Sequence, residues 1–142
     1  MRSRHFGLLA LALLLAAACR TNVAAPTSSA AFGQLDLRIG TGAIATTGST
    51  LAVNYSGWLY DGNAADHKGA EFDTNGGTPF SFVLGTSTVI AGWDQGVVGM
   101  KEGGVRRLII PPSLAYGADR HGIIPPNATL VFDIELVTVT SP

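Results

Sequence analysis

The chain contains a single cysteine, and this scarcity excludes two classes of protein. One thiol cannot form an intrachain disulfide, and it cannot supply a metal site built from several thiolates. An excess of one charge is missing too, because 9 basic residues oppose 10 acidic residues for a formal net charge of −1. Nucleic-acid binding needs a basic surface, whereas the only adjacent basic pair is Arg106-Arg107, so we expect no nucleic-acid partner.

Catalytic and cofactor motifs of the common kinds are also absent. His5, His67 and His121 lack the spacing of metal ligands, and no serine stands in the G-x-S-x-G motif of hydrolases. The glycines within residues 40–48 form no phosphate-binding loop, because they precede a strand-like segment whereas such loops open a helix. The sequence therefore predicts neither a metal site nor a cofactor.

The composition that remains favours one β-rich domain. Of the 142 residues 46% are hydrophobic, which is enough for one core, and the 18 glycines argue for a loop-rich protein. Residues 89–100 form the only plausible helix, interrupted by Gly96, and residues 60–73 are expected to form a long surface excursion. We predict the α+β class, with an antiparallel sheet covered by one short helix. Strand-like alternation occurs in residues 35–39, 51–60, 79–85, 105–111 and 128–139.

The N-terminus has the order of a secretory signal peptide. Arg2 and Arg4 precede an apolar run, residues 8–15, which is too short to span a bilayer and ends in small residues. We expect residues 1–18 to be removed, residues 19–31 to form a flexible tether, and residues 32–142 to form the folded domain. We therefore expect an exported protein of the periplasm or cell envelope.

Cys19 lies directly after the predicted signal peptide. A lone cysteine after three alanines resembles the lipobox of bacterial lipoproteins, in which the cysteine becomes the lipidated first residue. The motif usually has a leucine three positions before the cysteine, whereas Leu15 lies four before it. Ordinary signal peptidases also accept such alanines, which would leave a free thiol. We predict lipidation of Cys19 and hence a membrane anchor, with the free thiol as the alternative.

The stretch "GIIPPNATLVFDIEL" places two apolar residues in an unexpected setting. Pro125-Pro126 cannot lie inside a strand, because proline has no N–H for the ladder, so Ile123 and Ile124 belong to a loop. Tyr116 lies in the same loop, which should be solvated. Apolar loop residues beside other aromatic residues near turns indicate a pocket.

Six segments resemble those of one known family in order and spacing. The chain resembles the FKBP-type peptidyl-prolyl cis–trans isomerases from about Leu35 to Val139. The resemblance implies a strongly bent antiparallel β-sheet wrapped around one short α-helix. It also implies an isomerase that accelerates rotation about Xaa-Pro bonds and assists folding, with proline-containing polypeptides as substrates and rapamycin-type macrolides as inhibitors. The segments are "VNYSGWLYDG", "FDTN", "PFSFVLG", "VIAGWDQGVVGMKEGG", "RLIIPPSLAYG" and "GIIPPNATLVFDIEL".

The resemblance also implies which residues form the pocket. Trp93 would form the floor beneath the prolyl ring, and Tyr116 would donate its hydroxyl to a substrate carbonyl. Asp73 would orient Tyr55 or interact with the twisted carbonyl carbon, or else it caps a turn. Ile123 joins the set as the neighbour of Ile124. The positions matched by motif are Tyr55, Phe72, Asp73, Phe80, Val89, Ile90, Trp93, Tyr116, Ile124 and Phe132.

Three segments depart from the family pattern. Residues 63–71 are an insertion, residues 74–78 are short and lack basic residues, and residues 118–122 are one residue shorter than the usual rim loop. Two alternatives therefore stay open: a binding module without turnover, and a structural lipoprotein whose aromatic residues form only a core. The joint presence of Tyr55, Asp73, Trp93 and Tyr116 argues against both. Because the helical segment by which some exported relatives dimerise is absent, a monomer is expected.

Overall fold

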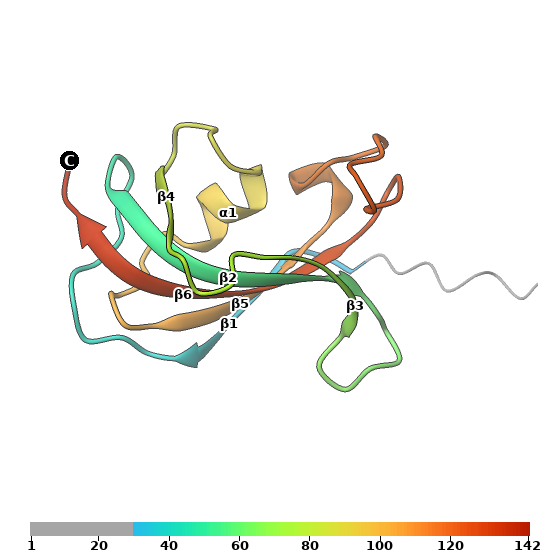
Figure 1. The fold of residues 1–142 in the computed structure, drawn as a ribbon, viewed down its shortest axis with the longest axis horizontal. Coiled ribbons are helices and arrows are strands. Elements are labelled where there is room, and N and C mark those ends of the chain that lie inside the picture. The colour runs from blue at the N-terminus through green and yellow to red at the C-terminus, as the bar shows by residue number, and fades with distance from the viewer. Residues whose placement is uncertain (1–29) are drawn as a thin grey trace, which may run out of the picture.

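The computed structural model describes residues 30–142, which form one curved antiparallel sheet and one short helix (Figure 1). The predicted α+β fold class is confirmed. The sheet order is β1-β5-β6-β2-β3, and β4 also pairs with β2. The predicted signal peptide, Cys19 and nearly all of the tether lie outside the described residues. The elements are β1 (Gly33–Arg38), β2 (Thr50–Tyr60), β3 (Lys68–Thr74), β4 (Phe80–Val83), α1 (Ala91–Gly96), β5 (Val105–Ile110), the 3-10 turn η1 (Pro112–Leu114) and β6 (Leu130–Thr140).

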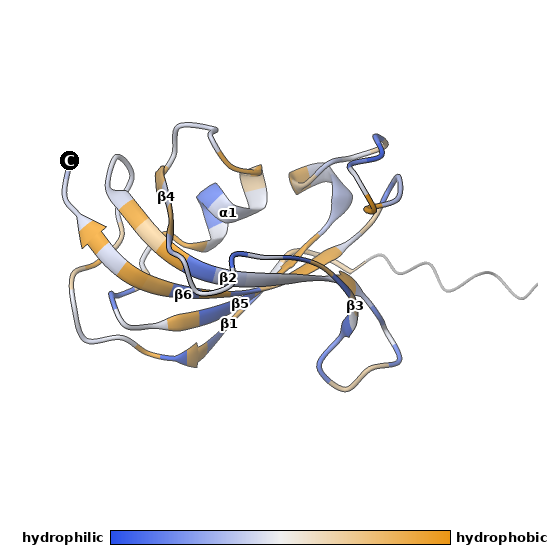
Figure 2. Ribbon diagram, in the orientation of Figure 1, coloured by the Kyte–Doolittle hydropathy of each residue, from blue (hydrophilic) through white to orange (hydrophobic). Residues whose placement is uncertain are grey.

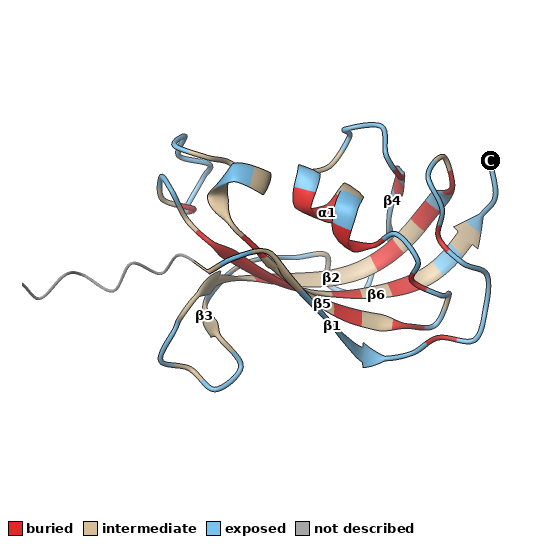
Figure 3. Cartoon of the chain, turned by 180° about the vertical axis from the view of Figure 1, so that it is seen from behind, coloured by how far each residue is buried: buried red, intermediate tan, exposed pale blue. Residues whose placement is uncertain are grey.

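The hydrophobic core lies between the concave face of the sheet and α1. On β6 the alternation places Phe132, Ile134 and Leu136 on that face, and all three are buried. Leu51 and Val53 of β2 are fully buried beside them. Figure 2 shows the apolar residues along β2 and β6, and Figure 3 shows that these strands and the inner side of α1 carry buried positions.

Helix α1 is shorter than predicted because tertiary packing determines its extent. It covers only Ala91–Gly96 of the 89–100 segment, so its own hydrogen bonds cannot stabilise it in isolation. A Cβ atom on Gly96 would lie 2.6 Å from the side chain of Leu108, and one on Gly92 would clash with Ile110. The two glycines therefore allow the helix to lie directly against β5, and Trp93 of the same helix is buried as well.

The prediction of a long surface excursion over residues 60–73 was wrong for its second half, because Lys68–Thr74 forms strand β3. The strand pairs with β2 in antiparallel register, with Glu71 opposite Trp58 and Lys68 opposite Tyr60. Every position of β3 is exposed or half-buried, so no apolar alternation marks it in the sequence. An edge strand of this kind is held by its backbone partners and by polar contacts.

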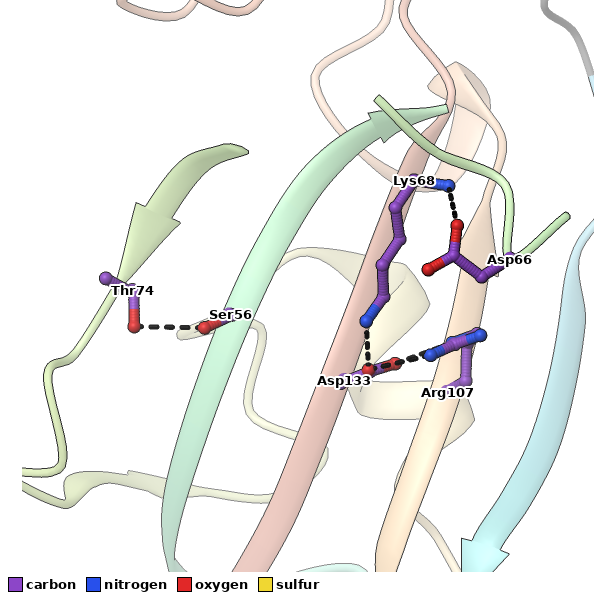
Figure 4. Close-up of polar contacts among 6 residues, drawn as sticks. All are labelled: Ser56, Asp66, Lys68, Thr74, Arg107 and Asp133. Atoms are coloured by element: carbon purple, nitrogen blue, oxygen red, sulfur yellow. Dashed lines mark hydrogen bonds and ion pairs between the residues drawn. The ribbon is translucent and has the colours of Figure 1, made fainter. Parts of the chain in front are cut away.

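Those polar contacts lie on the outer, convex face of the sheet (Figure 4). Asp133 of β6 forms ion pairs with Lys68 of β3 and Arg107 of β5. In both, the distance from the side-chain nitrogen to the carboxylate oxygen is 2.7 Å. The Lys68 ammonium also lies 3.9 Å from the ring centroid of Trp58. Burial opposes ionisation of Asp133, but the hydrogen bonds from Arg107 and Lys68 outweigh it and hold the pKa of this carboxyl below its usual value. We call Lys68, Arg107 and Asp133 the outer network.

No helix within residues 30–142 has the length and apolar composition that crossing a membrane requires.

Candidate functional site

A cavity of about 390 Å³ opens on the concave side of the sheet, beside α1. Four strands, the helix and two loops contribute its lining. The segment just before α1 supplies three lining residues, and the loop after η1 supplies one. The lining consists of Tyr55, Phe72, Asp73, Phe80, Thr88, Val89, Ile90, Trp93, Tyr116 and Phe132.

Trp93 forms the floor of this cavity. The residue is only 4% exposed, and its ring meets Tyr55 edge-on at a centroid distance of 5.0 Å. Phe132 meets it in the same manner at 5.3 Å and 88°. The indole Nε1 is buried and has no hydrogen-bond partner among the described residues. The floor is therefore aromatic, with edge-to-face contacts that fix the ring orientations.

A bulge in the pairing of β2 with β3 brings two successive residues to the cavity. Alternation would send Phe72 and Asp73 to opposite faces, but the register shifts between Gly57 and Trp58, and both residues line the cavity. A Cβ on Gly57 would lie 2.7 Å from the rings of Phe72 and Phe132. Only glycine at this position lets the two phenylalanines approach as they do.

The two phenols of the cavity remain neutral hydrogen-bond donors. Tyr55 donates its hydroxyl to Asp73 at 2.8 Å, and Asp73 lies in β3. Burial, reinforced by the hydrogen bond to Asp73, raises the pKa of Tyr55 to about 12. Burial and then the negative charge of Asp73 raise the pKa of Tyr116 as well. No hydrogen bond within residues 30–142 involves the Tyr116 hydroxyl, so this donor is available to a ligand.

One wall of the cavity is a loop fixed by Asp94. The Asp94 carboxylate accepts hydrogen bonds from the amides of Gly85 at 2.8 Å and Ser87 at 3.0 Å. The loop leads into Thr88 and Ile90, which line the cavity. Sequence reasoning missed Thr88, because a threonine in an aperiodic loop carries no signal of its own.

The structure does not bring Ile123 and Ile124 to the cavity lining. Ile124 is 4% exposed and packs in the core, while Ile123 is 65% exposed at a turn. The Ile124 amide donates to the His121 carbonyl at 2.9 Å and is therefore not available to a substrate. The placement therefore gives no support to direct contact of these two residues with a prolyl ring.

The comparisons with known proteins agree with this geometry. The family model of FKBP-type peptidyl-prolyl cis-trans isomerases matches residues 42–137. The chain belongs to this family. An FK506-binding protein of Neisseria meningitidis is 45% identical over 105 residues, which are 73% of this chain and 92% of that protein. FK506-binding protein 4 of Neurospora crassa is 47% identical over 105 residues, but this chain spans only 21% of its length.

Solved structures of FKBP-type proteins share the fold. The crystal structure of FkpA from Escherichia coli matches with a TM-score of 0.64 and 41% identity, over 78% of this chain and 48% of that one. The crystal structure of AtFKBP13 matches with a TM-score of 0.65 and 36% identity, over 77% of this chain and 93% of that one. The resemblance drawn from the six segments is confirmed. The enzyme class is peptidyl-prolyl cis–trans isomerase, and the FKBP family in general binds proline-containing peptides and FK506- or rapamycin-type ligands.

Proposed function

We propose that this FKBP-type chain acts on exported proteins, accelerating rotation about their Xaa-Pro bonds and thereby assisting their folding. The observation that carries the proposal is the cavity itself. Aromatic rings line the space with Trp93 as its floor, and the Tyr116 hydroxyl is a donor without a partner among the described residues. Such a cavity fits an apolar five-membered ring and a neighbouring carbonyl.

Desolvation supplies the main catalytic effect in this proposal. Rotation about a peptide bond has a barrier of about 18–20 kcal/mol, and no covalent bond has to break. At the barrier the C–N bond is twisted and the carbonyl is less polarised, so water stabilises the planar amide more than the twisted one. An apolar cavity removes that preference and lowers the barrier. Trp93, Phe80 and Phe132 are the walls that exclude water.

Two donors orient the substrate. Tyr116 donates its hydroxyl to one substrate carbonyl, and the Ile90 amide, which no hydrogen bond within residues 30–142 uses, donates to a neighbouring one. Asp73 fixes Tyr55 through their 2.8 Å hydrogen bond. Each tenfold gain in rate requires about 1.4 kcal/mol, so pocket fit and one or two hydrogen bonds are sufficient for several powers of ten.

The primary test is a prolyl isomerisation assay on a short Xaa-Pro peptide with the mature chain and its Tyr116→Phe variant. We expect acceleration by the unmodified chain and a loss of about threefold to tenfold in kcat/KM in the variant, because one hydrogen bond of about 0.5–1.5 kcal/mol is removed. Melting temperatures should agree. A folded chain that binds a rapamycin-type macrolide without accelerating any peptide would instead establish a binding module.

Export and lipidation are the second part of the proposal. The support is the N-terminal pattern, a short apolar run after two arginines and before Cys19. A lipid on Cys19 would hold the domain at a membrane through the tether of residues 19–31. Mass spectrometry of the processed protein should find Cys19 as the lipidated first residue, and Cys19→Ser should release the chain from membranes. An unmodified thiol at the mature terminus would establish ordinary cleavage.

A further inference from the structure

The position of the Tyr116 ring depends on contacts of its faces. Its hydroxyl has no hydrogen bond within residues 30–142, so no polar partner fixes the ring. Its backbone lies in the loop between η1 and β6, where no sheet ladder holds it. The ring of His121 lies parallel to it, with a centroid distance of 4.1 Å and an interplanar angle of 4°. This is the closest pair of aromatic rings among the described residues.

The backbone of His121 is fixed from the core. His121 and Ile124 exchange two backbone hydrogen bonds, from the His121 amide at 3.1 Å and from the Ile124 amide at 2.9 Å. The turn between them contains Gly122 at a φ of 56°, which glycine adopts without strain. Ile124 is 4% exposed and packs in the core. The core thus holds Ile124, Ile124 holds His121, and the His121 ring covers one face of Tyr116.

The other end of the loop is fixed beside Tyr116. The Gly117 amide donates to the Pro112 carbonyl at 2.9 Å, and the Asn127 amide donates to the Gly117 carbonyl at 2.8 Å. These bonds hold the backbone next to Tyr116 but do not by themselves fix the side-chain rotamer. The half-buried ring packs against the core on its inner side, and the stacked imidazole of His121 is a further contact that restricts its rotation.

We propose that His121 is a positioning residue that keeps the Tyr116 hydroxyl directed at the cavity. The proposal rests on the function given above, in which that hydroxyl donates to a substrate carbonyl. His121 is exposed and does not line the cavity, so it acts through Tyr116 and not on the substrate. A flat aromatic ring at position 121 retains the stack, whereas a small aliphatic side chain removes it.

The experiment compares five variants of the mature chain in the peptide assay, with kcat and KM determined separately. His121→Ala removes the stack, His121→Phe retains it, Tyr116→Phe removes the hydroxyl, and the double variant Tyr116→Phe/His121→Ala closes the cycle. Arg120→Gln is the matched control, an exposed neighbour in the same loop. Because these positions other than Tyr116 are exposed, melting temperatures should stay within about 2 °C.

We expect His121→Ala to lower kcat/KM about fivefold and His121→Phe to stay within about twofold of the unmodified chain. In the Tyr116→Phe background, loss of the imidazole should change kcat/KM by less than about 1.5-fold, because the hydroxyl that it positions is already absent. Arg120→Gln should have no effect. This pattern of rescue and non-additivity differs from that of a residue that only stabilises the loop.

Three outcomes would overturn the proposal: unchanged activity in His121→Ala, equal losses in His121→Ala and His121→Phe, or losses that multiply fully in the double variant. NMR of the Tyr116 ring protons gives a readout independent of activity, since the ring-current shift from the stack should vanish in His121→Ala and persist in His121→Phe. If the unmodified chain accelerates no peptide, the proposed function fails, and the NMR result still decides whether His121 holds the Tyr116 ring.

Discussion

The two faces of the sheet differ in how far their polar groups are paired, although successive residues of the same strand contribute to both faces. Phe132 of β6 lines the cavity, and the next residue, Asp133, binds Lys68 and Arg107 on the outer face. The outer carboxylate is fully engaged by its partners. On the cavity side the Trp93 Nε1 and the Tyr116 hydroxyl have no partner among the described residues.

This contrast separates stabilisation from catalysis. A saturated ion-pair network contributes to the free energy of unfolding and offers no free polar group to a ligand, whereas an aromatic surface with unused donors can bind a ligand and gains less stability from its own polar groups. Substitutions on the cavity face should therefore lower activity, whereas substitutions in the outer network should lower stability and leave activity unchanged.

Replacing the cavity floor should have the greatest effect on activity. Trp93→Leu removes the indole that meets Tyr55 and Phe132 edge-on. We expect kcat/KM to fall about 30-fold, equivalent to about 2 kcal/mol in the activation free energy. The free energy of unfolding should fall by about 1–3 kcal/mol, since a buried side chain is shortened. Peptide assays and thermal melts measure the two quantities on the same samples.

Leu136→Val is the matched control for that prediction. Leu136 is fully buried on the same face of β6 but does not line the cavity. Loss of one methylene should cost about 1 kcal/mol of stability and leave kcat/KM within about twofold. If this variant lost as much activity as Trp93→Leu, general loosening of the core would explain both results, and the division between the faces would fail.

An intermediate effect, on stability alone, is expected from the outer network. Asp133→Asn removes the charge that Lys68 and Arg107 share, and should lower the free energy of unfolding by about 1–2 kcal/mol with kcat/KM unchanged. Because the pKa of Asp133 is lowered by folding, its stabilisation is present above the unfolded carboxylate pKa of about 3.9 and is lost as the pH falls through the folded value. Chemical denaturation should show a smaller difference in the free energy of unfolding between the unmodified chain and Asp133→Asn at pH 3 than at pH 7.

The same contrast explains which features the sequence could predict. On β6, Leu130, Phe132, Ile134 and Leu136 alternate with residues of the outer face, and the structure places all four in the core. Strand β3 could not be predicted in this way, because its residues are exposed or half-buried without apolar alternation, and its pairing with β2 is interrupted by register shifts.

The site shows the same limit. Tyr55 and Trp93 lie in segments that resemble the family motifs, and both line the cavity. Thr88 lies in a loop without periodicity and was missed. Ile123 and Ile124 were singled out because apolar residues are unusual in a loop. Their placement shows that a loop residue can face the core of its own domain: Ile124 anchors the rim loop, and Ile123 only completes the turn.

The smallest effect is expected from pH, because folding keeps both cavity phenols neutral. The pKa of Tyr55 is raised to about 12 and that of Tyr116 is also raised, so both should donate hydrogen bonds throughout pH 7–10. The stability that Tyr55 contributes is present below the unfolded tyrosine pKa of about 10 and is lost as the pH rises towards 12. We expect kcat/KM to stay constant within about 1.5-fold from pH 7 to pH 10, with circular dichroism confirming a folded chain. A decline centred at or below pH 10 that disappears in Tyr116→Phe would show that Tyr116 ionises as an exposed phenol does, and would remove this part of the contrast between the two faces of the sheet.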